Sequence, residues 1–333
     1  MLVHVLHHGR CFDGTASACL FSALFRSVVE SSARMRFIPK HYGTGAAYDD
    51  TDFGGDVNAS VDFRYTQDPR LHWYFDHHRS AFQGGGDLDH FRADTTGLKF
   101  HDAVAPSCAR LIAQIGIQRY GFDPSPFVEL LRWADIIDTA RFSSPTLAVS
   151  MSEPALQLAA FVQANGDETT ATRLIESLLR HPIDQVVRQP FVARVVEGRA
   201  KQHEANVRLV TSRSRIDREA VVLYDLLDDA PRVLNHFIPY DLHPECRYVV
   251  GGYVGADHDL KLMVGFNPWQ RPELREHNIA DLCERFGGGG HAHVGGCTFP
   301  AQHKSRLRQI LSEIVCELAG LPTEPRASSS NPR

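Results

Sequence analysis

Short apolar runs alternate with longer amphipathic stretches through the first half of the chain. Runs rich in β-branched and aromatic residues predict strands at residues 2–6, 34–42, 55–63 and 71–75. Between and after them, apolar positions recur every three or four residues and predict helices at 15–33, 107–121 and 124–142. This alternation is typical of a parallel sheet with helices on both faces. The sequence therefore predicts an α/β fold.

The second half changes from a continuous helical pattern to strands interspersed with helices. Residues 154–212 have helical spacing, and their last part predicts a connecting helix. Strand-like runs follow at 219–226, 246–255 and 260–267, and an amphipathic helix closes the pattern at 305–321. We expect four parts: a parallel-sheet domain over 1–185, a helical linker over 186–215, a smaller α/β domain over 216–320 and a disordered polar tail over 321–333.

Composition and charge narrow the possible functions. The chain has 333 residues, 43% hydrophobic and 23% charged, as in ordinary globular proteins. A formal net charge of -5 provides no overall basic field for long duplex DNA, although a local site can still hold a small anion. The seven cysteines include no CxxC pair, the first residues lack a signal-peptide pattern, and no apolar run reaches membrane-spanning length. We expect a cytoplasmic protein with no membrane association.

Four short clusters carry side chains that bind divalent cations. They are His7, His8, Cys11 and Asp13 near the start, Asp62 after the third predicted strand, Asp76, His77 and His78 after the fourth, and Asp135 with Asp138 in a predicted helix. The carboxyl ends of parallel strands meet at one edge of a sheet, where ligands collect. Carboxylates with imidazoles suit Mn²⁺, Fe²⁺ or Zn²⁺ better than Ca²⁺. A bridging Asp would allow the two-metal arrangement that acts on phosphate esters.

Each cluster also has an ordinary structural interpretation. An Asp after a strand commonly caps the next helix, and a single His at a strand end is usually just hydrogen-bonded. The pair His77 and His78 after Asp76 is harder to explain by packing, because a buried imidazole costs free energy unless each nitrogen has a partner. Taken together, the four clusters favour a metal site.

The order of these motifs resembles that of the DHH phosphoesterase superfamily with a DHHA1 C-terminal domain. The shared elements are DHH at 76–78, a His-to-Asp-Gly element near the N-terminus, an isolated Asp, a later Ala-Asp and a distant GGGGH at 287–291. DHH alone is weakly specific, whereas its combination with the distant glycine motif is strongly so. The resemblance covers residues 2–320 and implies a catalytic metal-binding domain over 1–185 and a substrate-binding domain over 216–320.

The resemblance implies a set of metal ligands. The stretch HGRCFDG matches a subgroup motif that begins at His8, while the more usual spacing to Asp13 begins at His7, so which histidine binds stays open. Cys11 stands where most members have an Asp, and a soft thiolate there would favour Zn²⁺ or Fe²⁺ over Mn²⁺. The implied ligands are His7, His8, Cys11, Asp13, Asp62 as the bridging residue, His77, and Asp135 in preference to Asp138 because a small residue precedes it.

The resemblance also implies residues that act on or hold the substrate. Asp76 is expected to orient His77, and His78 to face the substrate phosphate or complete the support of the ligands. The substrate-binding set is Arg10, Gly288, Gly289, Gly290, His291 and Asn267. A glycine loop lets backbone N–H groups approach an anion, although a flexible turn is the alternative. Many members have Ser-x-Arg-Ser where this chain has Asn267, so we expect nucleotide recognition to differ there.

The implied activity is hydrolysis of phosphodiester or phosphomonoester bonds in short oligonucleotides or small nucleotides, as in an oligoribonuclease. The expected cofactors are two divalent metal ions, preferably Mn²⁺, with Fe²⁺ or Zn²⁺ as alternatives. The expected partner is a short oligonucleotide or nucleotide rather than long duplex DNA, and a homodimer is possible. Two alternatives stay open: a hydrolase of inorganic polyphosphate or pyrophosphate, and a nucleotide-binding sensor that has lost turnover.

Overall fold

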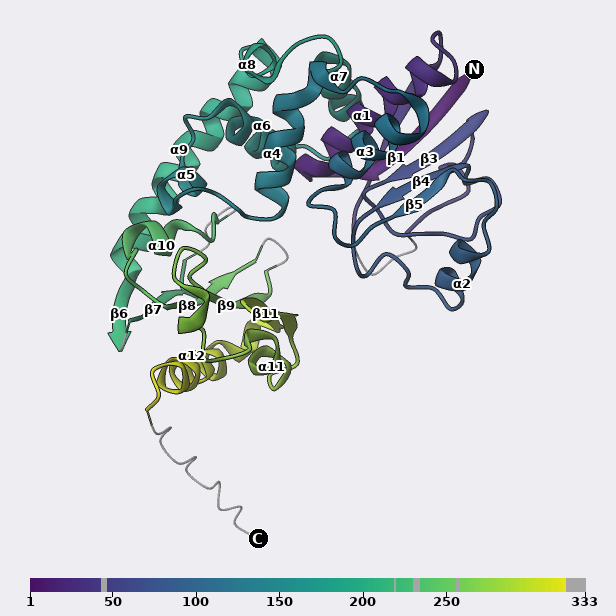
Figure 1. Cartoon of the computed structure of the whole chain (residues 1–333). Helices are drawn as coiled ribbons and strands as arrows, with labels where there is room; N and C mark the ends of the chain where they lie inside the picture. The colour runs from purple at the N-terminus through teal and green to yellow at the C-terminus, as the bar shows by residue number, and fades with distance from the viewer. Residues whose placement is uncertain (43–46, 219, 230–233, 256–257, 322–333) are drawn as a thin grey trace. The chain divides into compact units, whose positions relative to one another are not determined.

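A computed structural model describes residues 1–42, 47–218, 220–229, 234–255 and 258–321 (Figure 1). The chain forms two compact units. The first contains Met1–Phe142 and Ser150–Arg199, and the second contains Ser143–Val149 and Ala200–Arg333. The predicted disorder of the tail concerns residues 322–333 almost entirely, which lie outside the described residues.

The first unit is built on a five-stranded parallel sheet, as the sequence predicts. Its strand order is β2 (Arg34–Lys40), β1 (Leu2–His8), β3 (Val57–Val61), β4 (Trp73–Asp76) and β5 (Lys99–His101). The chain goes from β1 to β2 on one side and then returns to place β3 on the other side. Ligands of open α/β sheets bind at such a reversal, outside the carboxyl ends of the strands. Here those ends are His8 of β1 and Asp62, which directly follows β3.

Helices cover one face of this sheet. Phe21 of α1 (Phe12–Val28) packs against Trp73 and Phe75 of β4, with ring centroids 5.8 and 6.1 Å apart. Small residues on α1 allow it also to contact α3 and α4, so the helix is almost entirely buried. The other helical elements of this unit are α2 (Asp87–Arg92), α3 (Cys108–Tyr120), η1 (Ser125–Phe127), α4 (Val128–Asp138), α6 (Pro154–Ala164), α7 (Glu168–Leu178), α8 (Ile183–Val186) and the start of α9 (Pro190–Arg213).

The opposite face is covered largely by loops. Leu6, Ile38 and Tyr74 point from the strands into a buried apolar cluster with Phe53 and Tyr65, which lie on connecting segments. The short helix α2 adds partly buried Phe91 to this cluster. The sequence predicts helices on both faces. On this face the described residues place one short helix, α2, and the rest of the cover consists of loops.

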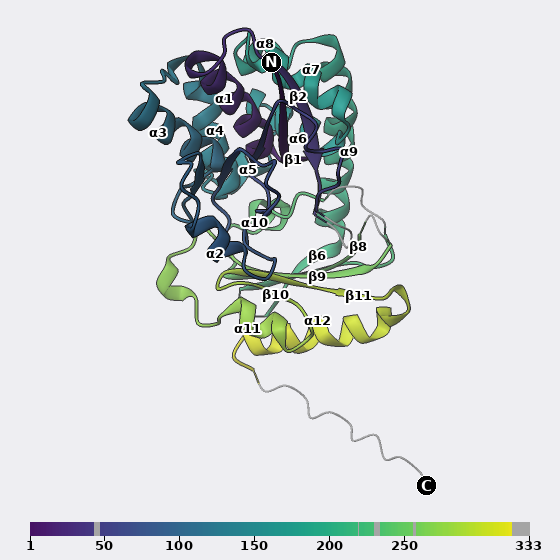
Figure 2. The ribbon, with the colours of Figure 1, turned by 90° about the vertical axis from the view of Figure 1, so that its right-hand side faces the viewer.

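The second unit contains a mixed six-stranded sheet. Its order is β10 (Gly289–His291), β11 (Val294–Phe299), β9 (Leu260–Phe266), β8 (Tyr248–Val254), β7 (Val221–Leu226) and β6 (Ser214–Arg218), with only β7 and β8 parallel. Apolar residues of α11 (Ile279–Glu284) and α12 (Lys304–Leu318) pack on one face (Figure 2). Val210 of α9 and residues of α10 (Ile238–Leu242) pack on the other.

The remaining short elements of the second unit are α5 (Pro145–Val149), η2 (Pro272–Leu274) and η3 (Ala301–His303). Alternate residues of β7 and β8 enter the two apolar clusters, which is the side-chain alternation expected of strands buried on both faces. Among the described residues, none of the helices combines the length and the apolar character needed to cross a bilayer.

Candidate metal centre

Three overlapping groups of ligand side chains lie at the carboxyl end of the parallel sheet. They are His8 with Cys11 and Asp62, Asp62 with His77 and His78, and Asp13 with His77 and Asp138. In each group one ligand atom from every residue lies within 4.8 Å of the others. Asp62 and His77 each belong to two groups, so the three form one continuous cluster. We call these seven residues the ligand cluster.

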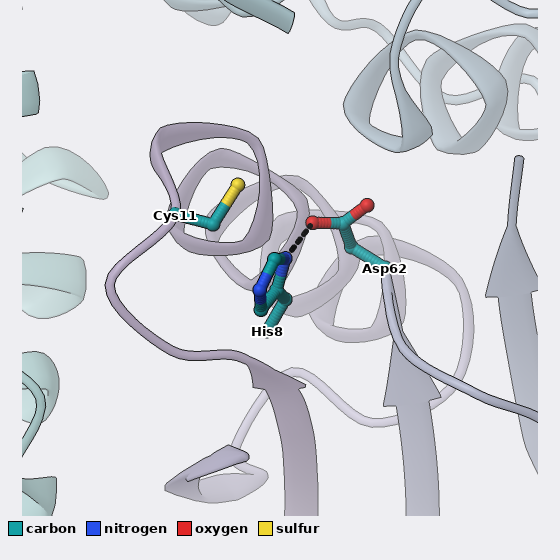
Figure 3. Close-up of side chains that lie close together, drawn as sticks. All are labelled: His8, Cys11 and Asp62. Carbon is teal, nitrogen blue, oxygen red and sulfur yellow. Dashed lines mark ion pairs between the residues drawn. The ribbon is translucent and has the colours of Figure 1, made fainter. Parts of the chain in front are cut away.

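The first group joins the ends of β1 and β3 to the start of α1 (Figure 3). His8 Nδ1 lies 3.5 Å from Asp62 Oδ2, and Cys11 is the N-cap residue of α1. Asp62 has a φ of 57°, a left-handed conformation that Asp tolerates better than most residues. This turn directly after β3 aims the carboxylate at His8, and Asp62 itself is fully buried.

His77 stands at the centre of the cluster. Its Nε2 lies 3.6 Å from Asp13 Oδ2, 3.6 Å from Asp62 Oδ1 and 3.3 Å from Asp138 Oδ2. Its Nδ1 lies 3.0 Å from the carbonyl oxygen of Ala105, to which a neutral imidazole donates from that nitrogen. The backbone carbonyl thus fixes the ring so that Nε2 faces the three carboxylates with its lone pair.

The expectation that Asp76 orients the His77 ring is wrong in one respect. Asp76 Oδ1 accepts from the backbone N–H of His77 at 2.8 Å, but its side-chain partner is His78, whose Nδ1 lies 2.7 Å away. Tyr74 donates its hydroxyl to Asp76 Oδ2 at 3.1 Å, within the same strand. Because Asp76 is the last residue of β4, its carboxylate folds back over the following turn and holds His78 instead.

Buried ligand atoms in the cluster lack hydrogen-bond partners within the described protein. They are both carboxylate oxygens of Asp62, His8 Nδ1 and His77 Nε2. Leaving a buried polar atom unpaired costs roughly 1–3 kcal/mol, so a set of such atoms aimed at one space indicates a missing electrophilic partner. Carboxylate and imidazole atoms in this arrangement fit divalent cations.

The charges in the cluster point to the same conclusion. Burial, followed by the charges of Asp13, Asp76 and Asp138, raises the pKa of Asp62 well above its ordinary value. Burial and the charge of Asp13 raise the pKa of Asp138 to about 6. Carboxylates that repel one another in this way lack enough positive charge from the protein, and bound cations would supply it.

His8 and Cys11 are both uncharged without a cation. Burial, with the nearby histidines His78 and His41, lowers the pKa of His8 to about 4, so its ring is neutral at physiological pH as a metal ligand must be. Burial and the charges of Asp62 and Asp13 raise the pKa of the Cys11 thiol well above its usual value. Cys11 therefore offers a protonated, weakly coordinating sulfur unless a cation displaces the proton.

Asp13 is anchored by the start of another helix. Its Oδ2 accepts from the N–H of Cys108 at 2.7 Å and its Oδ1 from that of Ala109 at 3.0 Å, the first two residues of α3. Gly14 lets the start of α1 lie against the end of β1, because a Cβ there would lie 2.1 Å from the carbonyl oxygen of His8. In the Asp-Gly pair of the sequence motif, Asp13 therefore supplies the carboxylate, and Gly14 is required because the backbone of His8 leaves no room for a side chain.

The preference for Asp135 over Asp138 is not supported by the geometry. Asp135 accepts from Ser107 Oγ at 2.7 Å and from Arg110 Nη2 at 2.6 Å, whereas Asp138 Oδ2 faces His77. Both lie on α4, one turn apart. The competing partner, Arg110, lies on α3, 25 residues earlier, so its contact with Asp135 cannot be read from the sequence.

His7 and Arg10 lie outside the three ligand groups. Burial lowers the pKa of His7 to about 4, and its Nδ1 lies 3.2 Å from the carbonyl oxygen of His8. Its buried Nε2 has no hydrogen-bond partner in the part of the chain that the structure describes. The structure therefore places His8, rather than His7, in the cluster. Arg10 is exposed, has a φ of 57°, and its side chain lies against Gly166.

The glycine motif forms a strand rather than an open loop. Gly289, Gly290 and His291 make β10, which pairs antiparallel with β11. A Cβ on Gly288 would lie 2.2 Å from the carbonyl oxygen of Gly296, and Gly290 has a φ of 155°. Packing of this hairpin therefore explains Gly288 and Gly290, while His291 is exposed.

Asn267 is not available to a substrate. It is fully buried, and its Nδ2 donates to the carbonyl oxygens of Pro244 at 3.1 Å and Cys246 at 2.8 Å. Its Oδ1 accepts from the N–H of Trp269 at 3.0 Å. Both amide hydrogens are used, so its role is to fix the turn after β9, which corrects the expected substrate contact.

Comparisons with known proteins identify the fold. Neither a family model nor a curated protein matches the sequence. Among solved structures, the pGpG-specific phosphodiesterase PggH from Vibrio cholerae is similar, with a TM-score of 0.69 and 20% identity over 97% of this chain and 100% of that one. A DHH domain from a member of the s1p family of ribosomal proteins matches with a TM-score of 0.60 and 15% identity, over 96% of this chain and 87% of that one.

A manganese-bound RecJ from Thermus thermophilus also matches, with a TM-score of 0.52 and 14% identity. It covers 96% of this chain but 52% of that one, so this chain spans about half of RecJ. With a parallel-sheet unit, a mixed-sheet unit and His and Asp side chains at the sheet edge, the chain has the fold of DHH-domain proteins.

Proposed function

We propose that the protein is a metal-dependent phosphoesterase that hydrolyses short oligonucleotides or small nucleotides. The observation that carries this proposal is the ligand cluster, whose residues come from four separate segments and share Asp62 and His77 between groups. Within the described protein, ligand atoms of His8, Asp62 and His77 are buried there without hydrogen-bond partners. A fold stabilised only by its own contacts gains nothing from such an arrangement. Functional sites tolerate buried polar atoms without partners, because the bound ligand supplies the missing interactions.

When bound, a pair of divalent cations would acidify the attacking water and stabilise charge on the phosphoryl oxygens. The ligands that we propose for them are His8, Cys11, Asp13, Asp62, His77 and Asp138, with Asp62 bridging because both of its oxygens face ligand groups. Mn²⁺ is the preferred cation, which agrees with the metal in the similar RecJ structure.

Other side chains serve the substrate in this proposal. His78 is tied through Nδ1 to Asp76, which leaves its half-buried ring oriented to donate from Nε2 to a phosphoryl oxygen. Hydrogen bonding to Asp76 and the charges of Asp76, Asp138 and Asp13 outweigh the effect of burial and raise the pKa of His78, which favours a donating ring. In the second unit, exposed His291 stays the candidate for substrate contact.

Charge and the similar structures support this choice of substrate class. A net charge of -5 gives no overall basic field for a long polyanion, so a short substrate held at the cluster fits better. PggH, whose fold is similar over 97% of this chain and 100% of its own, is a phosphodiesterase specific for pGpG. A linear dinucleotide is therefore the first substrate to test.

The test begins with protein stripped by a chelator and reloaded with Mn²⁺. It is then incubated with a linear dinucleotide, a five-residue RNA, a 3′,5′-bisphosphonucleoside and polyphosphate, while metal content is measured separately. We expect the dinucleotide or the short RNA to be consumed first, and only with metal. Consumption of polyphosphate alone would overturn the substrate class, and nucleotide binding by metal-loaded protein without turnover would indicate a sensor.

A further inference from the structure

Arg64 is a cationic side chain that forms no ion pair with any carboxylate of the described residues. Its guanidinium Cζ lies 4.9 Å from the ring centroid of Tyr42, and its Nε is buried without a hydrogen-bond partner within the described protein. Two other arginines of this unit have carboxylate partners. Arg70 pairs with Asp68 and also lies over an aromatic ring, and Arg110 pairs with Asp135. Arg64 thus has the stacking contact that Arg70 has, but not the carboxylate.

The position of Arg64 relates it to the ligand cluster. It follows Asp62 by two residues, and the ring on which it stacks touches two histidines of the cluster. The Tyr42 centroid lies 4.8 Å from that of His8 and 6.4 Å from that of His78. Tyr42 is 41% exposed, so the aromatic platform reaches the surface beside the cluster.

The surroundings hold Arg64 in place without neutralising it. Its backbone carbonyl accepts the hydroxyl of Tyr48, and the preceding Phe63 is fully buried with its ring centroid 4.9 Å from that of Tyr42. Although the cluster is rich in carboxylates, none forms an ion pair with Arg64 among the described residues. A guanidinium that is fixed, stacked and unpaired next to an acidic site is prepared to receive an external anion.

We infer that Arg64 binds a second phosphate group of the substrate, one beyond the phosphate that is cleaved. This inference rests on the proposed function. The Tyr42 ring contacts both the guanidinium and His8, and Arg64 belongs to none of the three ligand groups, so the anion on Arg64 would lie beside the scissile phosphate rather than at the ligand cluster itself. The chemical class that offers both is a dinucleotide or short oligonucleotide with a terminal phosphate monoester. Tyr42 is then a positioning residue for Arg64.

The experiment compares a 5′-phosphorylated dinucleotide with the same dinucleotide lacking that phosphate. For Arg64→Gln in Mn²⁺-loaded protein, we expect KM for the phosphorylated substrate to rise about tenfold or more, with little change in kcat. Constants for the unphosphorylated substrate should stay close to wild type. Arg64→Lys should recover part of the loss, because a point charge replaces the planar fork. Arg70→Gln is the matched control and should leave both substrates unaffected.

The possible results separate this inference from the proposed function. If Arg64→Gln weakens both substrates equally, or neither, Arg64 does not read a second phosphate and the inference is overturned while the phosphoesterase stands. If wild type hydrolyses neither dinucleotide, the proposed substrate is wrong. Calorimetric binding of a nucleoside 5′-monophosphate and of its nucleoside then decides for Arg64: a monophosphate preference that Arg64→Gln abolishes supports it, and equal binding by both proteins overturns it.

Discussion

The ligand cluster of the first unit and the glycine hairpin of the second stand out equally in the sequence but differ physically. In the cluster, both carboxylate oxygens of Asp62 and Nε2 of His77 are buried without a hydrogen-bond partner among the described residues. In the hairpin, β10 is paired with β11, and Gly288 and Gly290 are explained by close contact and backbone conformation. A conspicuous sequence motif is therefore evidence of a ligand-binding site only where the fold leaves buried polar atoms of that motif without hydrogen-bond partners.

Replacing Asp62 should break this contrast most strongly. Asp62→Asn keeps the size of the side chain and tolerates the φ of 57°. We expect the variant to lose bound metal, and hydrolysis to fall on the order of 10²–10³-fold or more. Because burial and neighbouring carboxylates raise the pKa of Asp62, its ionised form destabilises the metal-free fold at neutral pH. Chemical denaturation in chelator should therefore show the variant more stable by roughly 1–2 kcal/mol.

A metal-free variant that is clearly less stable than wild type would contradict the interpretation of Asp62 as a ligand. It would show that the carboxylate is a structural partner in the fold. In saturating Mn²⁺, wild type should gain about 2.7 kcal/mol at a hundredfold excess over its dissociation constant, and Asp62→Asn should gain much less.

The two acids of α4 provide a matched pair. Asp138→Asn should weaken Mn²⁺ binding on the order of 10–100-fold or more, because its oxygen faces His77. Asp135→Asn should leave metal affinity unchanged and cost about 1 kcal/mol of stability through the contact with Arg110. Metal titration and denaturation of both variants check this. The opposite assignment of effects would restore Asp135 as the ligand.

Alanine substitutions in the hairpin sharpen the other side of the comparison. Gly288→Ala should destabilise the second unit by about 1–3 kcal/mol, because the new Cβ would meet the backbone of Gly296. Gly289→Ala should change stability by less than about 0.5 kcal/mol, because no atom lies within 4 Å of its Cβ position. Thermal unfolding monitors both. Equal effects of the two substitutions would mean that packing does not explain the motif.

Cys11→Asp should strengthen metal binding, whereas the substitutions of Asp62 and Asp138 weaken it. The expected change in affinity is also the smaller one. The buried thiol stays protonated without a cation, whereas a carboxylate is a harder ligand that suits Mn²⁺. We expect Mn²⁺ to bind roughly tenfold more tightly, with any gain for Zn²⁺ smaller. Cys316→Asp, the same change on α12, is the control for added negative charge. Unchanged Mn²⁺ affinity in Cys11→Asp would remove Cys11 from the ligands.

The sequence predicted the fold and the location of the centre better than its contacts. Strands of the parallel sheet follow from short apolar runs, and the acids and histidines at their ends follow from the topology of such sheets. β5, only three residues long, was missed because so short a run carries no periodicity. The loops that cover the second face of the parallel sheet could not be predicted either, since their aromatic residues have no regular spacing.

Contacts between distant segments were beyond sequence reasoning. Whether Asp135 or Asp138 faces His77 depends on Arg110, and whether Asp76 holds His77 or His78 depends on how β4 ends. Asn267 looked like a polar substrate contact, but the buried carbonyl groups that it satisfies cannot be read from the sequence. Residue types predicted the chemistry, and long-range packing decided which residue carries it.

The single hydrogen that Gly14 carries in place of a side chain has a consequence for protein engineering. Because the start of α1 sits against the carbonyl of His8, the segment from His8 to Asp13 has no slack. Anyone who grafts this centre onto another parallel-sheet scaffold must transfer that glycine with the ligands, and must supply a helix whose first amides receive Asp13. A graft of the ligand residues alone, without this glycine, would leave the Asp13 carboxylate misplaced.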